Sequence, residues 1–223
     1  MSSNIQIRTN ALQCAIQRSM GHSKASKANT HARLVESAAA RFKERGVDGI
    51  SLADLMQDLK LTHGGFYKHF DSRDELVAEA LELALRQSGQ AMHQNLFDGD
   101  QADIAGFLDF YLNEAHRDGR AAGCAVVALA GDAARKSPEL QAQFRKQIES
   151  NLEDLSAALE RGGNKQPRET ALLLLSTLYG ALMMARAVGD SPLSREVLRT
   201  VRKQALALSG TEKRPRPRSK AKP

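Results

Sequence analysis

Apolar residues recur every three or four positions along most of the chain, which is the spacing of one face of an α-helix. Three helices are predicted near the N-terminus, over residues 30–45, 51–59 and 62–69, and a fourth runs from 72 to about 90. Five more segments of this kind cover residues 101–117, 124–135, 138–161, 167–188 and 192–208. No segment shows the alternation of a β-strand. The predicted fold class is all-α, with about nine helices.

Local signals mark where several of these helices start. Ser72 and Glu75 have the spacing of a capping box, which satisfies backbone N–H groups of the first turn. Ser137–Pro138 and Ser191–Pro192 each place a capping residue before a proline in the first helical position. These signals support the boundaries given above.

The composition narrows the class of protein. Only 4% of the 223 residues are aromatic and tryptophan is absent, which favours helices over sheets. No apolar run reaches the roughly 18 residues that a membrane span requires, because the longest, from Thr170 to Gly189, contains an arginine. The N-terminus lacks the apolar segment of a signal peptide. We therefore expect a cytoplasmic protein with no membrane partner.

The sequence does not support an enzyme. It has no metal-ligand pattern such as H-E-x-x-H, no glycine loop for phosphates after a strand and no credible Ser–His–Asp set. The two cysteines, Cys14 and Cys124, are too few and too far apart for a disulfide framework or a zinc site. We expect no catalytic residue, no metal and no cofactor.

The net charge of +6 is concentrated at the two ends of the chain. Residues 1–50 carry eight basic and three acidic side chains, and residues 210–223 carry six and one. Residues 91–209, in contrast, carry fourteen and fifteen. Basic ends of this kind are typical of arms that reach for a polyanion. A tail that only keeps the protein soluble is the alternative.

Two short helices separated by a tight turn, over residues 51–59 and 62–69, have the arrangement of a helix-turn-helix. In that motif the first helix crosses the DNA backbone and the second enters the major groove. The first has four apolar residues that would bury it against residues 30–45: Leu52, Leu55, Met56 and Leu59. The second carries polar groups suited to phosphates and base edges: Thr62, His63, Tyr67 and Lys68.

Two adjacent glycines stand inside the second of these helices. Gly64 and Gly65 each cost a helix interior about 1 kcal/mol relative to alanine. In a recognition helix they remove side chains, so that the first turn can lie close to DNA. Because Gly65 offers no hydrogen bond to a base, His63, Lys68 and the shape of the DNA must supply more of the specificity.

The whole stretch GISLADLMQDLKLTHGGFYKHFDSRDELVAEAL closely resembles the DNA-binding domain of the TetR/AcrR family of transcriptional repressors. That family shows a small polar residue, a glycine two positions later and then Tyr-x-His-Phe-x-Ser/Asn-Lys-Asp/Glu, a pattern that residues 62–74 follow. The resemblance is strong over about residues 22–82. Arg73 departs from it by replacing the usual lysine, which keeps the charge but changes its geometry. Gly65 departs from it where many members carry a side chain able to touch a base.

The resemblance implies roles for the matching residues. Phosphates would be contacted by Tyr67 and His69, and the major groove would be lined by His63, Gly65 and Lys68. The alternative for His69 is that it packs or caps locally. The expected DNA-binding residues are Lys24, Lys27, Ser51, Thr62, His63, Gly64, Gly65, Tyr67, Lys68, His69 and Arg73.

The chain is thereby divided into four parts. Residues 1–25 are a disordered or basic arm, in which we expect translation to start at Met20. Residues 26–74 are the helix-turn-helix domain, and residues 75–209 are a helical domain for effector binding and dimerisation. Residues 210–223 form a disordered basic tail with no residue that builds a core.

In the TetR family the helical body binds a small molecule, and its last two long helices pair with a second chain. A homodimer seam is therefore expected over residues 167–208, through Ala171, Leu174, Leu175, Leu178, Ala181, Leu182, Ala185, Leu193, Val197, Leu198, Val201, Ala205 and Leu208. The alternative is that these residues only fill the monomer core. A pocket for an unknown effector is expected near Phe107, Phe110, Tyr111, Phe144, Tyr179 and Met183.

Cys124 lies at the predicted start of a helix, four residues after Arg120. A helix N-terminus and a nearby cation favour the thiolate. Its surroundings, GC-x-x-x-x-L-A followed by SPEL, resemble a TetR subgroup in which some members sense electrophiles or oxidants through a cysteine here. The alternative is a small buried residue at a helix start.

The sequence thus predicts a ligand-responsive, sequence-specific repressor that leaves a palindromic operator in double-stranded DNA when an inducer binds. An architectural protein that coats DNA without sequence preference is the alternative, and the near-neutral body disfavours it. An activator is a variant that the sequence leaves open.

Overall fold

The computed structural model describes residues 26–210. Three predictions lie outside these residues: DNA contact by Lys24, the translation start at Met20 and the basic tail. The described chain begins with a helix over residues 26–45, called the first helix below. It is followed by α2 (Leu52–Asp58), α3 (His63–Phe66), α4 (Arg73–Leu96), β1 (Phe97–Asp98), β2 (Gln101–Ala102), α5 (Ile104–Tyr111), α6 (Glu114–Asp118), a 3₁₀ turn (Arg120–Ala122), α7 (Ala125–Arg135), α8 (Pro138–Arg161), α9 (Pro167–Ala187) and α10 (Pro192–Ser209).

The all-α prediction is confirmed, and the Ser-Pro starts of α8 and α10 are where the sequence placed them. The single helix expected over 101–117 is wrong. The chain leaves the helix at Leu112, and Asn113 caps a new one by accepting a hydrogen bond from the His116 N–H at 2.7 Å. This break accounts for one helix more than expected in the described range.

The region after α4 also differs from the prediction. The helix continues beyond residue 90 to Leu96, because Met92 and Leu96 extend its buried stripe. It is followed by a two-residue antiparallel pair, with Phe97 opposite Ala102 and Asp98 opposite Gln101. Gly99 in the connecting turn has φ +56°, which glycine adopts without a Cβ penalty.

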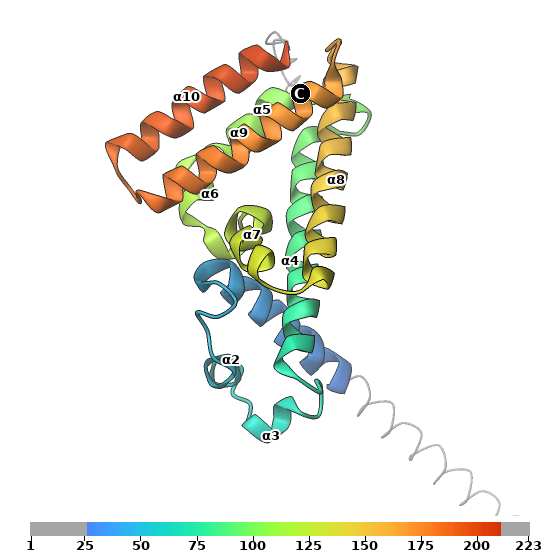
Figure 1. Cartoon of the computed structure of the whole chain (residues 1–223), viewed down its shortest axis with the longest axis vertical. Coiled ribbons are helices and arrows are strands. Elements are labelled where there is room, and N and C mark those ends of the chain that lie inside the picture. Colours follow the sequence, from blue (N-terminus) through green and yellow to red (C-terminus); the bar gives the residue numbers. More distant parts are fainter. Residues whose placement is uncertain (1–25, 211–223) are drawn as a thin grey trace, which may run out of the picture.

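The first helix, α2 and α3 form a small domain at one end of the molecule, and α4 leads from it into the helical body (Figure 1). α4 packs along α8, α8 along α9, and α9 along α10. Apolar side chains of both parts join one core, from Phe42, Phe66 and Phe70 in the small domain to Leu129 and Leu155 in the body. The small domain is therefore packed onto the body through a shared core.

α9 is long and apolar enough to cross a membrane by length and composition. One helix of this kind is weak evidence for a membrane protein, and its buried side, which includes Leu174, Leu178 and Leu182, faces other helices of the body.

Candidate nucleic-acid interface and regulatory cavity

α2 and the turn after it are held by local hydrogen bonds. The Ser51 hydroxyl oxygen accepts from the Asp54 N–H at 3.2 Å, and the Asp54 carboxylate accepts from the Ser51 N–H at 3.0 Å, which completes a capping box. Leu55 and Met56 are buried beneath α2. Lys60 closes the turn in the left-handed region, with φ +55°. The next helix is thereby set at an angle to α2.

The recognition segment is a short helix of four residues that begins after Thr62. Gly64 is exposed, and a Cβ built there would meet nothing within 4 Å. A Cβ at Gly65 would be 3.5 Å from the Thr62 hydroxyl oxygen, an ordinary contact. Neither glycine has a positive φ. Nothing in the described chain therefore requires glycine at these two positions.

The residues after the glycines are divided between the core and the surface. Phe66 and Phe70 are buried with their rings stacked 5.4 Å apart, while Tyr67 is 58% exposed and Lys68 is exposed. Aromatic packing thus fixes the segment to its domain and leaves Tyr67 and Lys68 on the outer surface.

His69 lies half-buried beside a hollow of about 350 Å³ that Lys27, Ala28 and His31 also line. Burial, and then the nearby His31, Lys27 and Lys68, lower the pKa of His69. Its Nδ1 is buried and has no hydrogen-bond partner among the described residues. The wall of the hollow therefore carries the Lys27 ammonium and two imidazole rings, and the Glu79 carboxylate lies 2.8 Å from Nε2 of His31.

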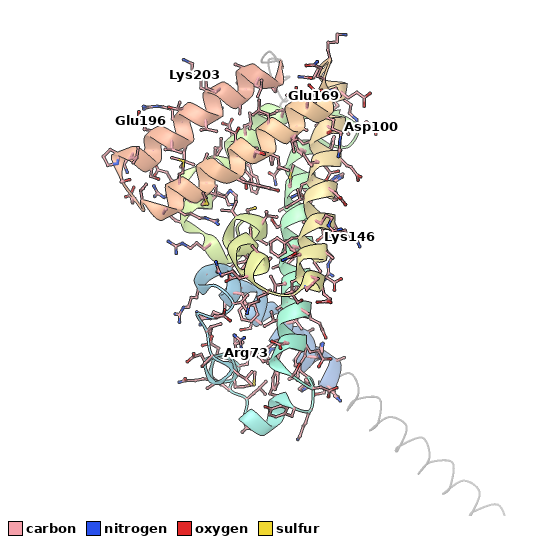
Figure 2. The ribbon with its side chains drawn as sticks, in the orientation of Figure 1. Arg73, Asp100, Lys146, Glu169, Glu196 and Lys203 are labelled. Atoms are coloured by element: carbon pink, nitrogen blue, oxygen red, sulfur yellow. The ribbon has the colours of Figure 1, made fainter. Side chains whose placement is uncertain are left out.

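Arg73 lies at the start of α4, as predicted, but its side chain turns back into the domain (Figure 2). Its guanidinium donates to the carbonyl oxygens of Val47 at 2.5 Å and Ile50 at 3.1 Å. The side chain thereby braces the loop that leads into α2.

The same loop is tied to α7 of the body. The Val47 N–H donates to the Asp132 carboxylate at 3.3 Å, and the Lys136 ammonium donates to Asp48 at 3.0 Å. Arg73 is 4.0 Å from the Asp48 carboxylate. A displacement of α7 would therefore be felt by the residues that position α2.

The other end of α7 borders a cavity inside the body. It is lined by residues of α4, α5, α6 and α8, and by the 3₁₀ turn and the two residues before α7. They are Ser88, Ala91, Met92, Phe110, Tyr111, His116, Ala122, Gly123, Cys124 and Asn151. The space open to a water-sized sphere is about 20 Å³, which is room for a single water molecule. The cavity therefore has no room for a larger molecule in this conformation, and it is called closed below in that sense.

Cys124 is buried and precedes the first residue of α7, as predicted for a helix start. Its N–H donates to Nε2 of His116 at 3.1 Å, while Nδ1 of His116 lies 2.7 Å from the Tyr111 carbonyl oxygen. Since Nε2 accepts, Nδ1 must carry the proton, and the imidazole is neutral. Burial, opposed by the hydrogen bond to Tyr111, lowers the pKa of His116.

Three predicted effector residues line this cavity: Phe110, Tyr111 and Cys124. Tyr179 does not line the cavity itself but is bonded to a residue that does, since its hydroxyl accepts from Asn151 at 2.8 Å. Phe107 and Phe144 are buried outside this lining, and Phe107 packs its ring 5.6 Å from that of Tyr111. Met183 of α9 does not line the cavity, and its side chain is 58% exposed.

Sequence reasoning missed Ser88, His116 and Asn151. His116 lies eight residues before Cys124, but only the glycines at 119 and 123 hinted at a sharp turn between them. The other two come from α4 and α8, which no local pattern connects to Cys124.

The predicted dimer seam requires a correction. Seven residues of α9 assigned to it fill the core of the monomer: Ala171, Leu174, Leu175, Leu178, Ala181, Leu182 and Ala185. Leu198 and Ala205 of α10 are also buried. Leu193 and Leu208 of the predicted seam are exposed. The other exposed apolar side chains of these helices, which the prediction did not include, are Leu172, Leu173, Met183 and Met184.

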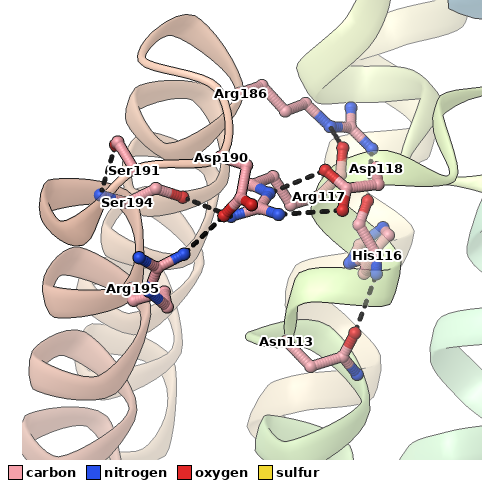
Figure 3. Close-up of polar contacts among 9 residues, drawn as sticks. All are labelled: Asn113, His116, Arg117, Asp118, Arg186, Asp190, Ser191, Ser194 and Arg195. Carbon is pink, nitrogen blue, oxygen red and sulfur yellow. Dashed lines mark hydrogen bonds and ion pairs between the residues drawn. The ribbon is translucent and has the colours of Figure 1, made fainter.

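A polar network joins α6 to the turn between α9 and α10 (Figure 3). Arg117 is 3% exposed and donates to Asp118 at 2.7 Å and to the Ser194 hydroxyl at 3.0 Å. Its distance to the Asp190 carboxylate is 3.3 Å. Arg186 of α9 donates to the carbonyl oxygens of His116 at 3.0 Å and Arg117 at 3.3 Å.

Two family models match the chain. "Bacterial regulatory proteins, tetR family" matches residues 34–80, and "Transcriptional regulator LmrA/YxaF-like, C-terminal domain" matches residues 101–204. The HTH-type transcriptional repressor NemR of Escherichia coli K12 is 24% identical over 168 residues, covering 71% of this chain and 84% of that protein. The HTH-type transcriptional regulator TtgR of Pseudomonas putida is 35% identical over 79 residues, covering 35% of this chain and 37% of that protein.

Solved structures share the fold. The reduced form of E. coli NemR superposes with a TM-score of 0.66 at 23% identity, covering 79% of this chain and 95% of that one. A TetR transcriptional regulator from Chloroflexus aurantiacus superposes with a TM-score of 0.69 at 25% identity, covering 83% and 94%. The likeness spans both the small domain and the body.

Proposed function

We propose that this chain, which belongs to the TetR family of transcriptional regulators, is a homodimeric repressor that a small-molecule effector releases from a palindromic operator. The observation that carries the proposal is the recognition segment. Phe66 and Phe70 are buried, Tyr67 and Lys68 lie on the outer surface, and the two glycines are not required by the fold.

In the proposed complex, α3 lies in the major groove with the Gly64 and Gly65 side close to the bases. His63 and Lys68 would contact base edges, and Tyr67 would contact a phosphate. Thr62 and Ser51, which precede α3 and α2, would add polar contacts to the backbone of the DNA. The hollow beside His69 suits a phosphate oxygen, because Lys27 and His31 line it as well.

Arg73 is assigned a structural role and not a contact to DNA. Because its guanidinium is held by two carbonyl oxygens, we propose that it positions the loop before α2, and that any phosphate contact at this point uses the N–H groups that begin α4.

The homodimer is proposed to form through the exposed face of α9 together with α10. Leu172, Met183 and Met184 lie on that face, and Gly180 among them has open space where a side chain would be. Exposed apolar residues on adjacent helices are typical of an interface between copies.

The effector is proposed to act at the cavity beside Cys124. Because the cavity is closed, an occupant must displace the helices around it, and α7 carries that displacement to Asp132 and Lys136. Loop 46–50 would then move, and with it the spacing of the two recognition segments.

For Cys124 we adopt the interpretation of a buried helix-start residue rather than a sensor, because the residue is only 4% exposed. The test treats wild type and Cys124→Ser with an electrophile such as N-ethylmaleimide and measures operator binding. Equal responses support this assignment, whereas loss of binding in wild type alone would establish a sensor.

The test of the proposed function selects bound sites from random duplex DNA and measures their affinity by fluorescence anisotropy across salt concentrations. We expect an inverted repeat, bound by a dimer and weakened steeply by salt. Lys68→Ala should lose affinity, while Lys146→Ala, an exposed lysine on α8 (Figure 2), should not. Equal affinity for the selected and random duplexes would instead establish the architectural alternative.

A further inference from the structure

Lys43 is a buried cation without a counter-ion. It lies on the first helix and is 6% exposed, yet no hydrogen bond or ion pair to its ammonium occurs among residues 26–210. The other deeply buried cation, Arg117, is paired with two carboxylates. Because a charge is costly to remove from water, the sparsely exposed Lys43 side chain is a candidate partner for an anion.

Arg186 is a second cation in the same place. Its guanidinium is bonded only to carbonyl oxygens, and no carboxylate pairs with it in the described part of the chain. A Cβ at position 123 would overlap Nη2 of Arg186, so the guanidinium lies directly against Gly123 in the cavity wall. Lys43, Arg186 and Cys124 interact electrostatically, and burial lowers the pKa of both cations.

Tyr111 adds an unused donor to the cavity wall. Its hydroxyl is buried with no nitrogen or oxygen partner among the described residues, and the thiol of Cys124 is its polar neighbour. A thiol is a weak hydrogen-bonding group, so the phenolic hydrogen is available to a better acceptor. None of the residues that line the cavity is acidic.

The rest of the wall fits an apolar body. Met92 and Phe110 line the cavity beside Tyr111, and His116 is neutral because Nδ1 and Nε2 are both engaged in the hydrogen bonds described above. The cavity therefore combines one unused donor and two nearby cations with apolar side chains.

We infer that the effector is a small carboxylate with an apolar body, whose carboxylate accepts from the Tyr111 hydroxyl and neutralises Lys43 and Arg186. The inference deepens the proposed function by giving the chemical class of the effector. Lys43 belongs to the first helix, so a carboxylate bound near it would act electrostatically on the DNA-binding domain.

The test uses the purified full chain without DNA, so that failure to bind a ligand is distinguishable from failure to bind an operator. Calorimetric titrations compare benzoate with benzamide and octanoate with octanamide, each up to about 10 mM, the limit at which binding is still measurable. We expect at least one carboxylate to bind and its amide to bind at least tenfold more weakly. Equal binding of acids and amides, or no binding by either acid, would overturn the inference.

Variants locate the site. Lys43→Met and Tyr111→Phe should each weaken carboxylate binding about tenfold, while Lys146→Met should not. Lys43→Met should also unfold at a higher temperature than wild type without ligand, because it removes an unpaired charge. If Lys43→Met does not fold, Tyr111→Phe, which loses a single oxygen, decides the outcome. Unchanged carboxylate binding in the folded variants would overturn the assignment.

A resident anion is the competing explanation. The Cys124 thiolate would supply it if the thiol were ionised at neutral pH. Absorbance at 240 nm in a Cys14→Ser background measures this directly. A thiolate signal that disappears in Lys43→Met would show that the cation already has its partner and would overturn the inference, whereas a protonated thiol supports it.

Discussion

Replacing Arg73 by methionine distinguishes two possible roles of this side chain at the start of α4: bracing the loop before α2 and contacting a DNA phosphate. Methionine keeps most of the apolar stem but removes the donors to Val47 and Ile50, which accept at 2.5 and 3.1 Å. A hydrogen bond from a charged donor contributes about 1.5–3 kcal/mol when buried. Because the Arg73 side chain is about one third exposed, we expect the two bonds together to contribute about 2 kcal/mol.

Urea unfolding followed by circular dichroism gives this loss directly, and the thermal midpoint should fall by about 4–8 °C for a chain of this length. Arg73→Lys should lose about half as much, because an ammonium cannot reach both carbonyl oxygens with the geometry of the guanidinium fork. The free energy of operator binding, measured on the folded variants, should fall by less than the free energy of unfolding does.

Lys68→Met is the matched comparison, since Lys68 is exposed and its side chain makes no hydrogen bond or ion pair among the described residues. It should weaken operator binding and leave the unfolding midpoint within about 0.5 kcal/mol of wild type. Should Arg73→Met instead keep its full stability and lose affinity as Lys68→Met does, Arg73 would be a phosphate contact and the bracing role would be wrong.

Three further predictions concern separate features. Lys60→Gly should stabilise the chain by about 0.5 kcal/mol because φ is +55° there, while Lys60→Val should destabilise it by about 1 kcal/mol, both measured by urea unfolding. Met183→Glu on the exposed face of α9 should convert the dimer to monomer in light scattering, whereas Lys146→Glu should not. His116 has a pKa lowered by burial, so the unfolded chain takes up a proton first. The free energy of unfolding should therefore fall as the pH drops below about 6.5, and His116→Gln should flatten that dependence.

The sequence was most informative where a local signal and an apolar stripe coincide. Ser137–Pro138 placed the start of α8 correctly, and the apolar spacing carried it to Arg161 as observed. The break at Leu112 was missed because Asn113, which caps the next helix, carries no local signal that marks it as a cap. An asparagine on a predicted helix surface looks the same whether it caps or simply faces water.

α9 shows a second limit. It is apolar on almost every side, so the hydrophobic pattern alone did not determine which face enters the core and which is left outside. The cavity shows a third, since helices far apart in sequence bring His116, Asn151 and Cys124 together. Only the packing of α4, α7 and α8 makes them neighbours.

The closed cavity has a consequence for the concentration at which such a regulator responds. If the ligand-accepting conformation is only a small fraction of the population, the apparent dissociation constant is the intrinsic one divided by that fraction. The response threshold is then set by the stability of the closed packing around Met92 and Phe110, and not by contacts to the ligand alone. A substitution that loosens this packing would shift the threshold to lower ligand concentrations without touching the ligand's charged end, so sensitivity and chemical selectivity are able to evolve separately.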